Sequence, residues 1–536
     1  MARRVPDVQV AVSWTWTVDD PFGGDYDILD HRLISNTLTW QYGRDVARPL
    51  GEPLTPTASW ECMNDDRILS PEWAGSPLYQ VLRPGRPTRI QAFLAEGEFY
   101  DLQSIRYDAD IDYDTDIDYD DGATPVMLHA GVLEQPEWTT ALGSPTVTMT
   151  SSGHLARLAR TKIRTPLYSS KRVDEAITIV LDTVEWPSAL RDLALADTTL
   201  DWFWVHDETA FEVLVRLQHT EGVPSLIWEG PDGVLHFEHR NYRTNTTRSN
   251  TAQAAFVDTH AGATDVTPTL THAGIGYRLP FSDIYNLVTC PVVRRERQAV
   301  QQVWEFGGPL VLGANETRIV TAVLSDPADG VVALGIGTDY AIGAGGLVAG
   351  PTIIESQAQT IRFTLTAGAG GCTVNGVTSD GPQIRATPVT VIWENTAENT
   401  IDTSASIAKY DPIANQPIPL ELQAYPEIPF STGEALCDAA AALYMEARPI
   451  VALRVLSADS DHLDNQLARR PSDRILVVGT PLGLEGDMHV EQIALRLIPE
   501  GVEAILTCER ALNQPGAAVW DDPESVWDGV DTLWGT

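Results

Sequence analysis

The residues with the clearest chemical potential are the aspartates of segment 107–120, in which every even-numbered position is aspartate. In an extended strand these carboxylates would share one face, roughly 6.6 Å apart, a repulsive row unless a cation or a turn relieves it. Hard cations take clustered carboxylates, so Asp112, Asp114 and Asp116 are candidate calcium ligands, and calcium is the one cofactor that the sequence offers. The pattern is not an EF-hand, because Asp121 occupies the required glycine position. The alternative is a solvated acidic hairpin.

The histidines offer less chemistry. His236 and His239 lie three residues apart on an expected strand, so they point to opposite faces and could share a metal ion only across a bulge. His206 beside Asp207 could be half of a nucleophilic site, but the chain has no G-x-S-x-G or H-E-x-x-H motif. Carboxylate pairs suited to glycoside hydrolysis are not specific among 74 acidic residues. We therefore predict no catalytic residues and a protein that is not an enzyme.

The net charge is the unusual bulk property, because 36 basic residues against 74 acidic residues leave −38. Such a surface repels phosphate backbones and anionic lipid heads, since binding either requires clustered cations. The charge argues against a direct grip on nucleic acid, whereas an acidic channel would let DNA slide through without sticking. Two origins stay open: arginine in place of lysine in a high-GC genome, or a salt-adapted acidic coat.

Length and hydrophobic content predict a folded multidomain chain. At 536 residues, a prior of about 150 residues per domain gives three or four domains. The five cysteines are far apart and form no C-x-x-C pair, so we expect buried thiols without a zinc site or a disulfide framework. The N-terminus lacks the apolar stretch of a signal peptide, and no run of about 18 apolar residues occurs. We expect synthesis in the host cytoplasm and no membrane span.

Most of the chain has the patterning of short strands. Residues 8–150 alternate between apolar and polar positions, with turn residues between the runs. Closely spaced strands of this kind favour a barrel or a sandwich. A glycine- and threonine-rich stretch at 304–393 indicates a self-contained β insertion whose glycines mark turns. The expected fold class is mainly β with α+β parts.

One compact helical block, at about 173–221, interrupts the β pattern. Apolar residues recur at helical spacing from the start of the block until Pro187 stops the helix. A second helix has Asp207 as its expected N-cap, one apolar stripe that includes Leu214, and Gly222 at its C-terminus. Both helices are therefore expected to dock on a core.

Two local patterns beyond this block predict further elements. Apolar runs flank a Gly-Pro-Asp-Gly turn at 226–237, which predicts a β-hairpin. Ser431 and Glu434 form a capping box, which predicts a helix that continues to about Arg448. Strands are expected again after that helix.

The last segment, 515–536, carries three tryptophans spaced seven residues apart within acidic sequence, at Trp520, Trp527 and Trp534. Proline and glycine between them argue against a coiled coil. The segment is either a disordered tail or an extended peptide whose indole rings anchor in the pockets of a partner.

Taken in order, several local patterns resemble minor tail proteins of actinobacterial siphophages that form the tail-tip or baseplate hub. The patterns are Trp-Gln-Tyr-Gly-Arg-Asp at 40–45, Ser-Pro-Leu-Tyr at 76–79, segments 82–90 and 131–134, a helix 152–160 closed by Arg160, Trp-Pro at 186–187, segment 197–200, Trp-Phe-Trp at 202–204, segments 221–224 and 283–289, and Arg-Pro at 448–449. The order of these patterns along the chain carries the resemblance. Segment 107–120 lies outside it, and no lysozyme- or peptidase-like extension follows.

The resemblance implies two tail-tube-like β-barrel domains in each chain and a homotrimer, whose pseudo-sixfold ring joins a sixfold tail tube to a threefold tip. The implied partners are the distal tail or tail tube protein, the tape-measure protein and other tail-tip or fibre proteins, with transient contact to ejected DNA. The implied location is the tail tip of the virion.

These expectations divide the chain into parts. They are an N-terminal β-barrel domain at 1–160 with the acidic hairpin, an α+β domain at 161–250, a second β-barrel domain from 251–303 and 394–430, the inserted β domain at 304–393, an α+β closing domain at 431–514, and the acidic tail at 515–536. The predicted function is a structural virion protein, a tail-tip or baseplate hub subunit that gates DNA ejection at host attachment. The alternative is a salt-adapted glycan-binding or glycan-degrading protein. The host (actinobacterial or haloarchaeal), the receptor and the side on which the insertion faces stay open.

Overall fold

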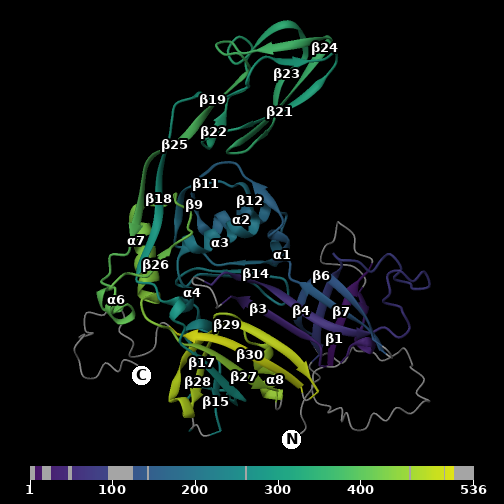
Figure 1. Cartoon of the computed structure of the whole chain (residues 1–536), viewed down its shortest axis with the longest axis vertical. Coiled ribbons are helices and arrows are strands. Elements are labelled where there is room, and N and C mark those ends of the chain that lie inside the picture. The colour runs from purple at the N-terminus through teal and green to yellow at the C-terminus, as the bar shows by residue number, and fades with distance from the viewer. Residues whose placement is uncertain are drawn as a thin grey trace.

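The computed structural model describes residues 7–14, 26–34, 36–45, 51–93, 125–141, 144–259, 262, 264–457, 460–499 and 501–511. The aspartates Asp112, Asp114 and Asp116 and the tryptophans Trp520, Trp527 and Trp534 lie outside the described residues, so their predicted roles stay predictions. The described residues form a mainly β structure of several sheets, with most of its helices in the middle (Figure 1). None of their helices is long and apolar enough to cross a membrane.

The described N-terminal strands pair into one antiparallel set, called the N-terminal unit. In sheet order it consists of β3 (Thr39–Arg44), β4 (Pro53–Met63), β7 (Ser144–Ser152), β6 (Val126–Ala141), β5 (Pro87–Phe93), β1 (Asp7–Ser13) and β2 (Tyr26–Ile28). Alternate side chains face the core, as in β4, where Ala58, Trp60 and Cys62 are buried. The β patterning of this part of the sequence is confirmed.

A second set of strands, called the C-terminal unit, repeats this arrangement. In sheet order it consists of β17 (Gly274–Arg278), β27 (Ile450–Leu456), β30 (Gly501–Arg510), β29 (Leu484–Ile498), β28 (Arg474–Gly479), β15 (Ala255–Val257) and β16 (Thr269–Thr271). Both units have the same sheet order when their strands are numbered along the chain. They differ in the direction of two pairings, because β1 is antiparallel to both β5 and β2, whereas β15 is parallel to both β28 and β16.

The two units meet at one seam, the pairing of β3 with residues 492–496 of β29. Through this seam, all fourteen strands belong to one sheet, and their buried side chains form one shared core. The pairing path ends at β2, β16 and β17, so the expected closed barrels are not found among the described strands.

The predicted helical block is present between the two units. α2 (Val173–Thr183) and α3 (Ala210–Glu221) pack on the same core, and Gly222 ends α3 with a φ of 90°. Leu214 is fully buried, in the stripe that the spacing predicts. The predicted hairpin is also confirmed, as the antiparallel pair β13 (Leu226–Glu229) and β14 (Leu235–Glu238).

The predicted N-cap of α3 is wrong. Thr209 caps this helix, because its side chain accepts a hydrogen bond from the backbone N–H of Glu212 at 3.2 Å, and the Glu212 carboxylate accepts one from the backbone N–H of Thr209 at 3.1 Å. Asp207 instead binds the guanidinium group of Arg164.

Two other helix boundaries also differ from expectation. The helix expected at 152–160 is limited to α1 (Leu155–Leu158), because Ser152 still belongs to β7. The capping box of Ser431 is not formed, since α7 (Phe430–Tyr444) begins after Pro429 and has no side-chain cap. A proline at that point fixes φ near a helical value, and the helix begins two residues earlier than a Ser431 cap predicts.

Short elements complete the described part of the chain. They are η1 (Asp30–Arg32), β8 (Lys162–Arg164), β9 (Tyr168–Arg172), η2 (Ser188–Leu190), β10 (Arg191–Leu193), β11 (Thr199–Phe203), β12 (His206–Thr209), α4 (Tyr242–Asn245), α5 (Thr247–Asn250), η3 (Phe281–Asp283), α6 (Ser404–Tyr410), α8 (Ser460–Leu467) and η4 (Thr480–Leu482). All five cysteines are buried and free, as predicted.

A β insertion leaves the middle of the molecule on two long strands and lies at the far end (Figure 1). Its strands are β18 (Leu287–Arg297), β19 (Gln301–Glu305), β20 (Leu310–Leu312), β21 (Thr317–Val323), β22 (Ala328–Val331), β23 (Ala341–Ser356), β24 (Thr360–Asn375) and β25 (Gln383–Glu398), with β26 (Pro419–Glu421) beside β18. It has a core of its own. Its glycines do not only mark turns: Gly345 and Gly371 lie inside β23 and β24 with positive φ, where a Cβ on Gly345 would meet the Gly371 carbonyl at 2.1 Å.

The Trp-Phe-Trp pattern at 202–204 fixes the helical block against this insertion. Phe203 is buried in an edge-to-face contact with Tyr425, at 5.5 Å between ring centroids. The guanidinium group of Arg295, on β18, lies 5.1 Å from the Trp204 ring, a cation–π distance. This pattern therefore packs the helical block against its neighbours.

Candidate functional site

The His206 and Asp207 pair is held apart by other partners. Arg164 binds Asp207 with two hydrogen bonds of 2.7 and 3.1 Å, which lower the pKa of that carboxyl group. His206 Nε2 lies 3.8 Å from Asp207, and its Nδ1 faces the Thr360 hydroxyl at 3.4 Å. This geometry ties β12 to β8 and to β24, and it leaves Asp207 committed to an arginine.

His236 and His239 turn to different partners, as the strand geometry predicts. His236 Nδ1 lies 2.9 Å from a carboxylate oxygen of Asp192, and its ring stacks on Trp228 at 4.0 Å between centroids. His239 Nδ1 lies 3.1 Å from Asp197. The two rings therefore do not share a ligand position.

Asp197, Glu221 and His239 form a cluster that sequence reasoning missed. One potential ligand atom from each lies within 4.8 Å of the others. Both oxygens of buried Glu221 accept backbone N–H groups, from Asp197 at 3.0 Å and from Thr198 at 3.1 Å. A carboxylate oxygen of Asp197 lies 3.1 Å from Nδ1 of His239 and accepts a hydrogen bond from the side-chain amide of Asn241 at 2.8 Å. Protein donors therefore already satisfy this cluster, which fastens the end of α3 to the loop before β11.

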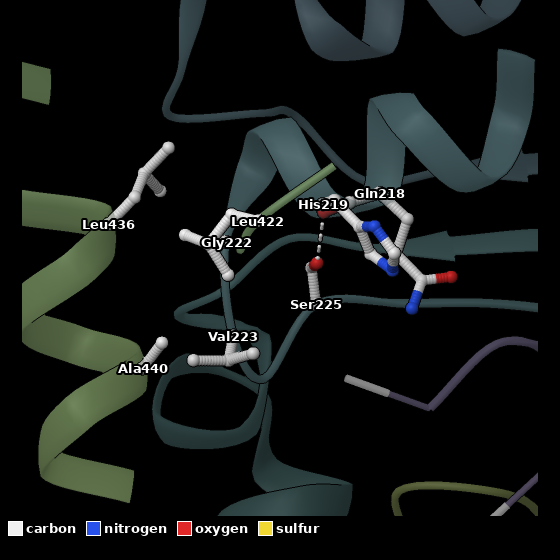
Figure 2. A pocket seen from close by; sticks show the side chains of 8 residues that line it. All are labelled: Gln218, His219, Gly222, Val223, Ser225, Leu422, Leu436 and Ala440. Atoms are coloured by element: carbon white, nitrogen blue, oxygen red, sulfur yellow. Dashed lines mark hydrogen bonds between the residues drawn. The ribbon is translucent and has the colours of Figure 1, made fainter. Parts of the chain in front are cut away.

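Figure 2 shows a small cavity between the C-terminal end of α3 and α7. Its space is about 10 Å³, room for about one water molecule. His219 borders it, is 8% exposed, and has no hydrogen-bond partner for either ring nitrogen among the described residues. Burial lowers the pKa of His219 to about 4, so the ring is neutral at pH 7. Ser225 does not reach the ring, since its hydroxyl donates to the Gln218 carbonyl at 2.8 Å.

A cluster of buried charges lies at the seam between the two units. Arg44, at the end of β3, forms an ion pair with Glu491 of β29 at 2.7 Å from its Nε, without the alignment of a hydrogen bond. A second nitrogen of the same guanidinium group lies 2.8 Å from Glu509. Arg243, on α4, donates two hydrogen bonds to Glu491 at 2.6 and 2.8 Å. Arg448 reaches Glu509 at 3.1 Å. Four separate parts of the chain therefore meet through two carboxylates.

Burial and ion pairing oppose each other in this cluster. The Glu491 side chain has no exposed surface, and burial alone would raise its pKa, but Arg243 and Arg44 outweigh that effect and lower it. Burial would likewise lower the pKa of Arg44, yet Glu491 and Glu509 raise it. Each group is charged only because its partners are, so the loss of one partner leaves a buried charge uncompensated.

Gly43 lets the backbones meet beside these ion pairs. Its φ is 120°, and a Cβ at this position would lie 2.4 Å from the carbonyl oxygen of Glu491. The neighbouring side chains Trp40 and Tyr42 are 3% and 5% exposed, and Tyr42 donates to the Arg469 carbonyl at 3.1 Å. The Trp-Gln-Tyr-Gly-Arg pattern that carries part of the family resemblance therefore builds the seam.

A polar cavity of about 50 Å³ adjoins this cluster. Glu238 lines it, and burial raises the pKa of this carboxyl to about 7. The Trp228 indole donates to Glu238 at 3.0 Å, and Ser472 donates to its other oxygen. The cavity has room for a few water molecules, and its acidic groups already have protein donors.

The seam was not identified from the sequence as a charge cluster. Arg44 stands within a pattern that drew attention, but Glu491 is one of 74 acidic residues, and about 450 residues separate the two, well beyond any local pattern. The ion pairs of this cluster hold four segments of the chain together.

No model of a protein family matches the chain, and no curated protein matches it either. Among solved structures, it is similar to a 43 kDa tail protein of a Shewanella oneidensis prophage, at 10% identity and a TM-score of 0.45, covering 94% of this chain and 98% of that one. A tail protein from Neisseria meningitidis gives 9% identity, a TM-score of 0.46, and coverage of 94% and 96%. A prophage tail protein from Listeria monocytogenes gives 8% identity, a TM-score of 0.41, and coverage of 95% of each chain.

These similarities extend over nearly the full length of each chain. All three TM-scores lie below 0.5 and no identity exceeds 10%, so the function has to be argued from the residues of this chain.

Proposed function

We propose that this chain is a structural, non-catalytic subunit of a virus tail, the tail-tip or baseplate hub of a long-tailed phage or archaeal virus. In the virion it would join the tail tube to the tip and gate DNA ejection at host attachment. Its partners would be the distal tail or tail tube protein, the tape-measure protein and other tail-tip or fibre proteins.

The repeated strand arrangement is the observation that carries this proposal. Two units with the same strand order lie side by side in one chain, joined rigidly through the seam of β3 and β29. A chain with two equivalent units converts threefold symmetry into a pseudo-sixfold ring when three copies associate. The family resemblance of the sequence implies such a ring, and the seam residues belong to the pattern that carries it.

The charge supports a passage for DNA. A net charge of −38 leaves few surface cations to bind phosphates, so a ring lined by this chain would not hold a passing DNA duplex.

Mass photometry and negative-stain electron microscopy of the purified chain test the proposal. We expect particles of three times the 58.5 kDa chain mass, seen end-on as rings with six lobes. A monomer at every concentration, whose thermal stability rises when oligosaccharides are added, would instead support the glycan-binding alternative.

A further inference from the structure

The two units can be aligned residue by residue through a shared irregularity. In β6 the pairing with β7 shifts register at Glu134, between Leu133 and Gln135. In β29 the pairing with β30 shifts register at Glu491, between Val490 and Gln492. Glu134 and Glu491 therefore occupy equivalent positions, and the residues that follow them correspond one to one.

The same alignment extends across the sheet to the outer strands. In the N-terminal unit, Leu133 pairs with Ser151 on β7, Ser151 pairs with Ala58 on β4, and Ala58 pairs with Trp40 on β3. In the C-terminal unit, Val490 pairs with Cys508 on β30, Cys508 pairs with Val451 on β27, and Val451 pairs with Tyr277 on β17. Trp40 of the N-terminal unit therefore corresponds to Tyr277 of the C-terminal unit.

Equivalent outer strands have opposite surroundings. Trp40 is 3% exposed and Tyr42 5%, because β29 pairs with β3 at the seam and β13 packs against the same strand. Their counterparts Tyr277 and Leu279 are 44% and 54% exposed. β17 pairs only with β27, so its other edge carries no described strand. Exposed aromatic and aliphatic side chains beside an open strand edge form a surface ready for strand pairing.

The strand that such an edge needs also has a stretch with no described strand on one side. At the seam, β3 pairs with the part of β29 that begins just after Glu491. The equivalent part of β6, residues 135–139, pairs with β7 on one side. On its other side β6 pairs with β5 only as far as Val132. Leu495 is 4% exposed in the seam, whereas its counterpart Trp138 is 39% exposed.

We propose that β17 of one copy of this chain pairs antiparallel with residues 136–139 of β6 in a second copy, and so repeats the seam between chains. The seam places Leu495 opposite Trp40 and Ala494 opposite Gln41. In the proposed junction the equivalent pairs are Trp138 with Tyr277, and Glu137 with Arg278.

Charge supports a second copy as the occupant. Glu137 and Arg278 are both exposed, and neither forms an ion pair with any residue that the structure describes. The proposed register sets them directly opposite each other, where opposite charges on paired strands attract.

The junction differs from the seam in its backbone bonds. Pro136 and Pro280 have no N–H group to donate, so they shorten the hydrogen-bonded ladder. The side-chain pairs around Trp138 and Arg278 must then supply much of the attraction. Proline at an edge also reduces pairing with unrelated strands, which favours the matched partner.

Head-to-tail pairing of this kind gives a ring when its rotation closes, as the proposed function requires, and an open filament when it does not. β17 and β6 are different surfaces, at the left and the right of the two units in Figure 1, so each copy offers one edge to each neighbour. The number of copies, three, rests on the proposed function, whereas the pairing rests only on the repeated units.

Cysteine cross-linking of the full chain tests the register. A chain carrying both Glu137→Cys and Arg278→Cys should form disulfide-linked multimers under mild oxidation, seen on non-reducing gels. The five native cysteines are buried and free, so the wild type should stay uncross-linked. Glu137→Cys combined with Gly274→Cys is the matched control, since Gly274 lies on the same strand out of register and has open space around it.

Charge exchange tests the pairing itself. Glu137→Arg or Arg278→Glu alone should weaken assembly at least tenfold, because each places like charges opposite each other, and the double variant should restore it. Glu394→Arg makes the same charge change on an exposed strand outside the junction and should leave assembly unchanged. A wild type that forms trimers while neither test gives this pattern would overturn the junction and leave the hub proposal standing. A wild type that is monomeric at every concentration would overturn both.

Discussion

Glu491 holds two buried arginines from different parts of the chain, so its replacement tests the account of the seam directly. In Glu491→Gln, Arg44 and Arg243 would face a neutral amide that can offer one acceptor oxygen where two are now used. Removing one partner of a buried ion pair costs roughly 3–5 kcal/mol, because the remaining charge stays desolvated. For a domain of 150–250 residues this corresponds to a melting temperature lower by roughly 10 °C.

Scanning calorimetry of Glu491→Gln beside the wild type measures this effect. Glu355→Gln is the matched control, because Glu355 pairs with Arg362 at 2.9 Å while both side chains are partly exposed, so little change is expected. The transition that involves the two strand units should move, whereas a separate transition of the insertion should not. If Glu491→Gln melted within about a degree of the wild type, the seam would owe its stability to apolar packing alone.

Three further predictions concern single positions. Leu214→Asp places an unpaired charge inside α3 and should prevent folding, measured as the loss of soluble, helical protein; a soluble, assembled variant would show that α3 is misplaced. Gly43→Ala should destabilise the chain by roughly 2 kcal/mol or more in urea unfolding, because its Cβ would collide with the Glu491 carbonyl, whereas Gly274→Ala should be nearly neutral. Burial raises the pKa of Glu229 to about 8, so the native state retains this proton more firmly than the unfolded chain. Its contribution to stability should therefore fall as the pH rises from about 4.5 towards 8, and Glu229→Gln should flatten that part of the melting-temperature profile; an unchanged profile would contradict it.

Local patterns in the sequence predicted the elements that local forces determine. The apolar stripe of α3, its end at Gly222 and the hairpin of β13 and β14 follow from spacing and turn residues alone. The predicted N-cap of α3 was wrong because two candidate acceptors lie close together before this helix. Thr209 lies in the capping position. Asp207 has a φ of 58°, and its carboxylate pairs with Arg164, which is distant in sequence.

Long-range pairing could not be predicted in the same way. The strands of the C-terminal unit are split by the insertion, so β17 and β27 pair across more than 170 residues, and no periodicity marks them as neighbours. The family resemblance predicted two β domains in each chain. The strand order that makes them equivalent, and the register shift at Glu134 and Glu491, emerged only from the structure.

Three arginines of this chain are mostly buried where segments meet. Arg44, Arg243 and Arg448 pair there with Glu491 and Glu509, so they do not face an approaching partner. At physiological ionic strength the Debye length is about 8 Å, so the total charge repels an approaching copy only at short range, and the residues at the contact decide whether it binds. Contact between two copies is then favoured where an exposed arginine has no ion-pair partner among the described residues. The edge of β17, with Arg278 beside Tyr277 and Leu279, meets this condition.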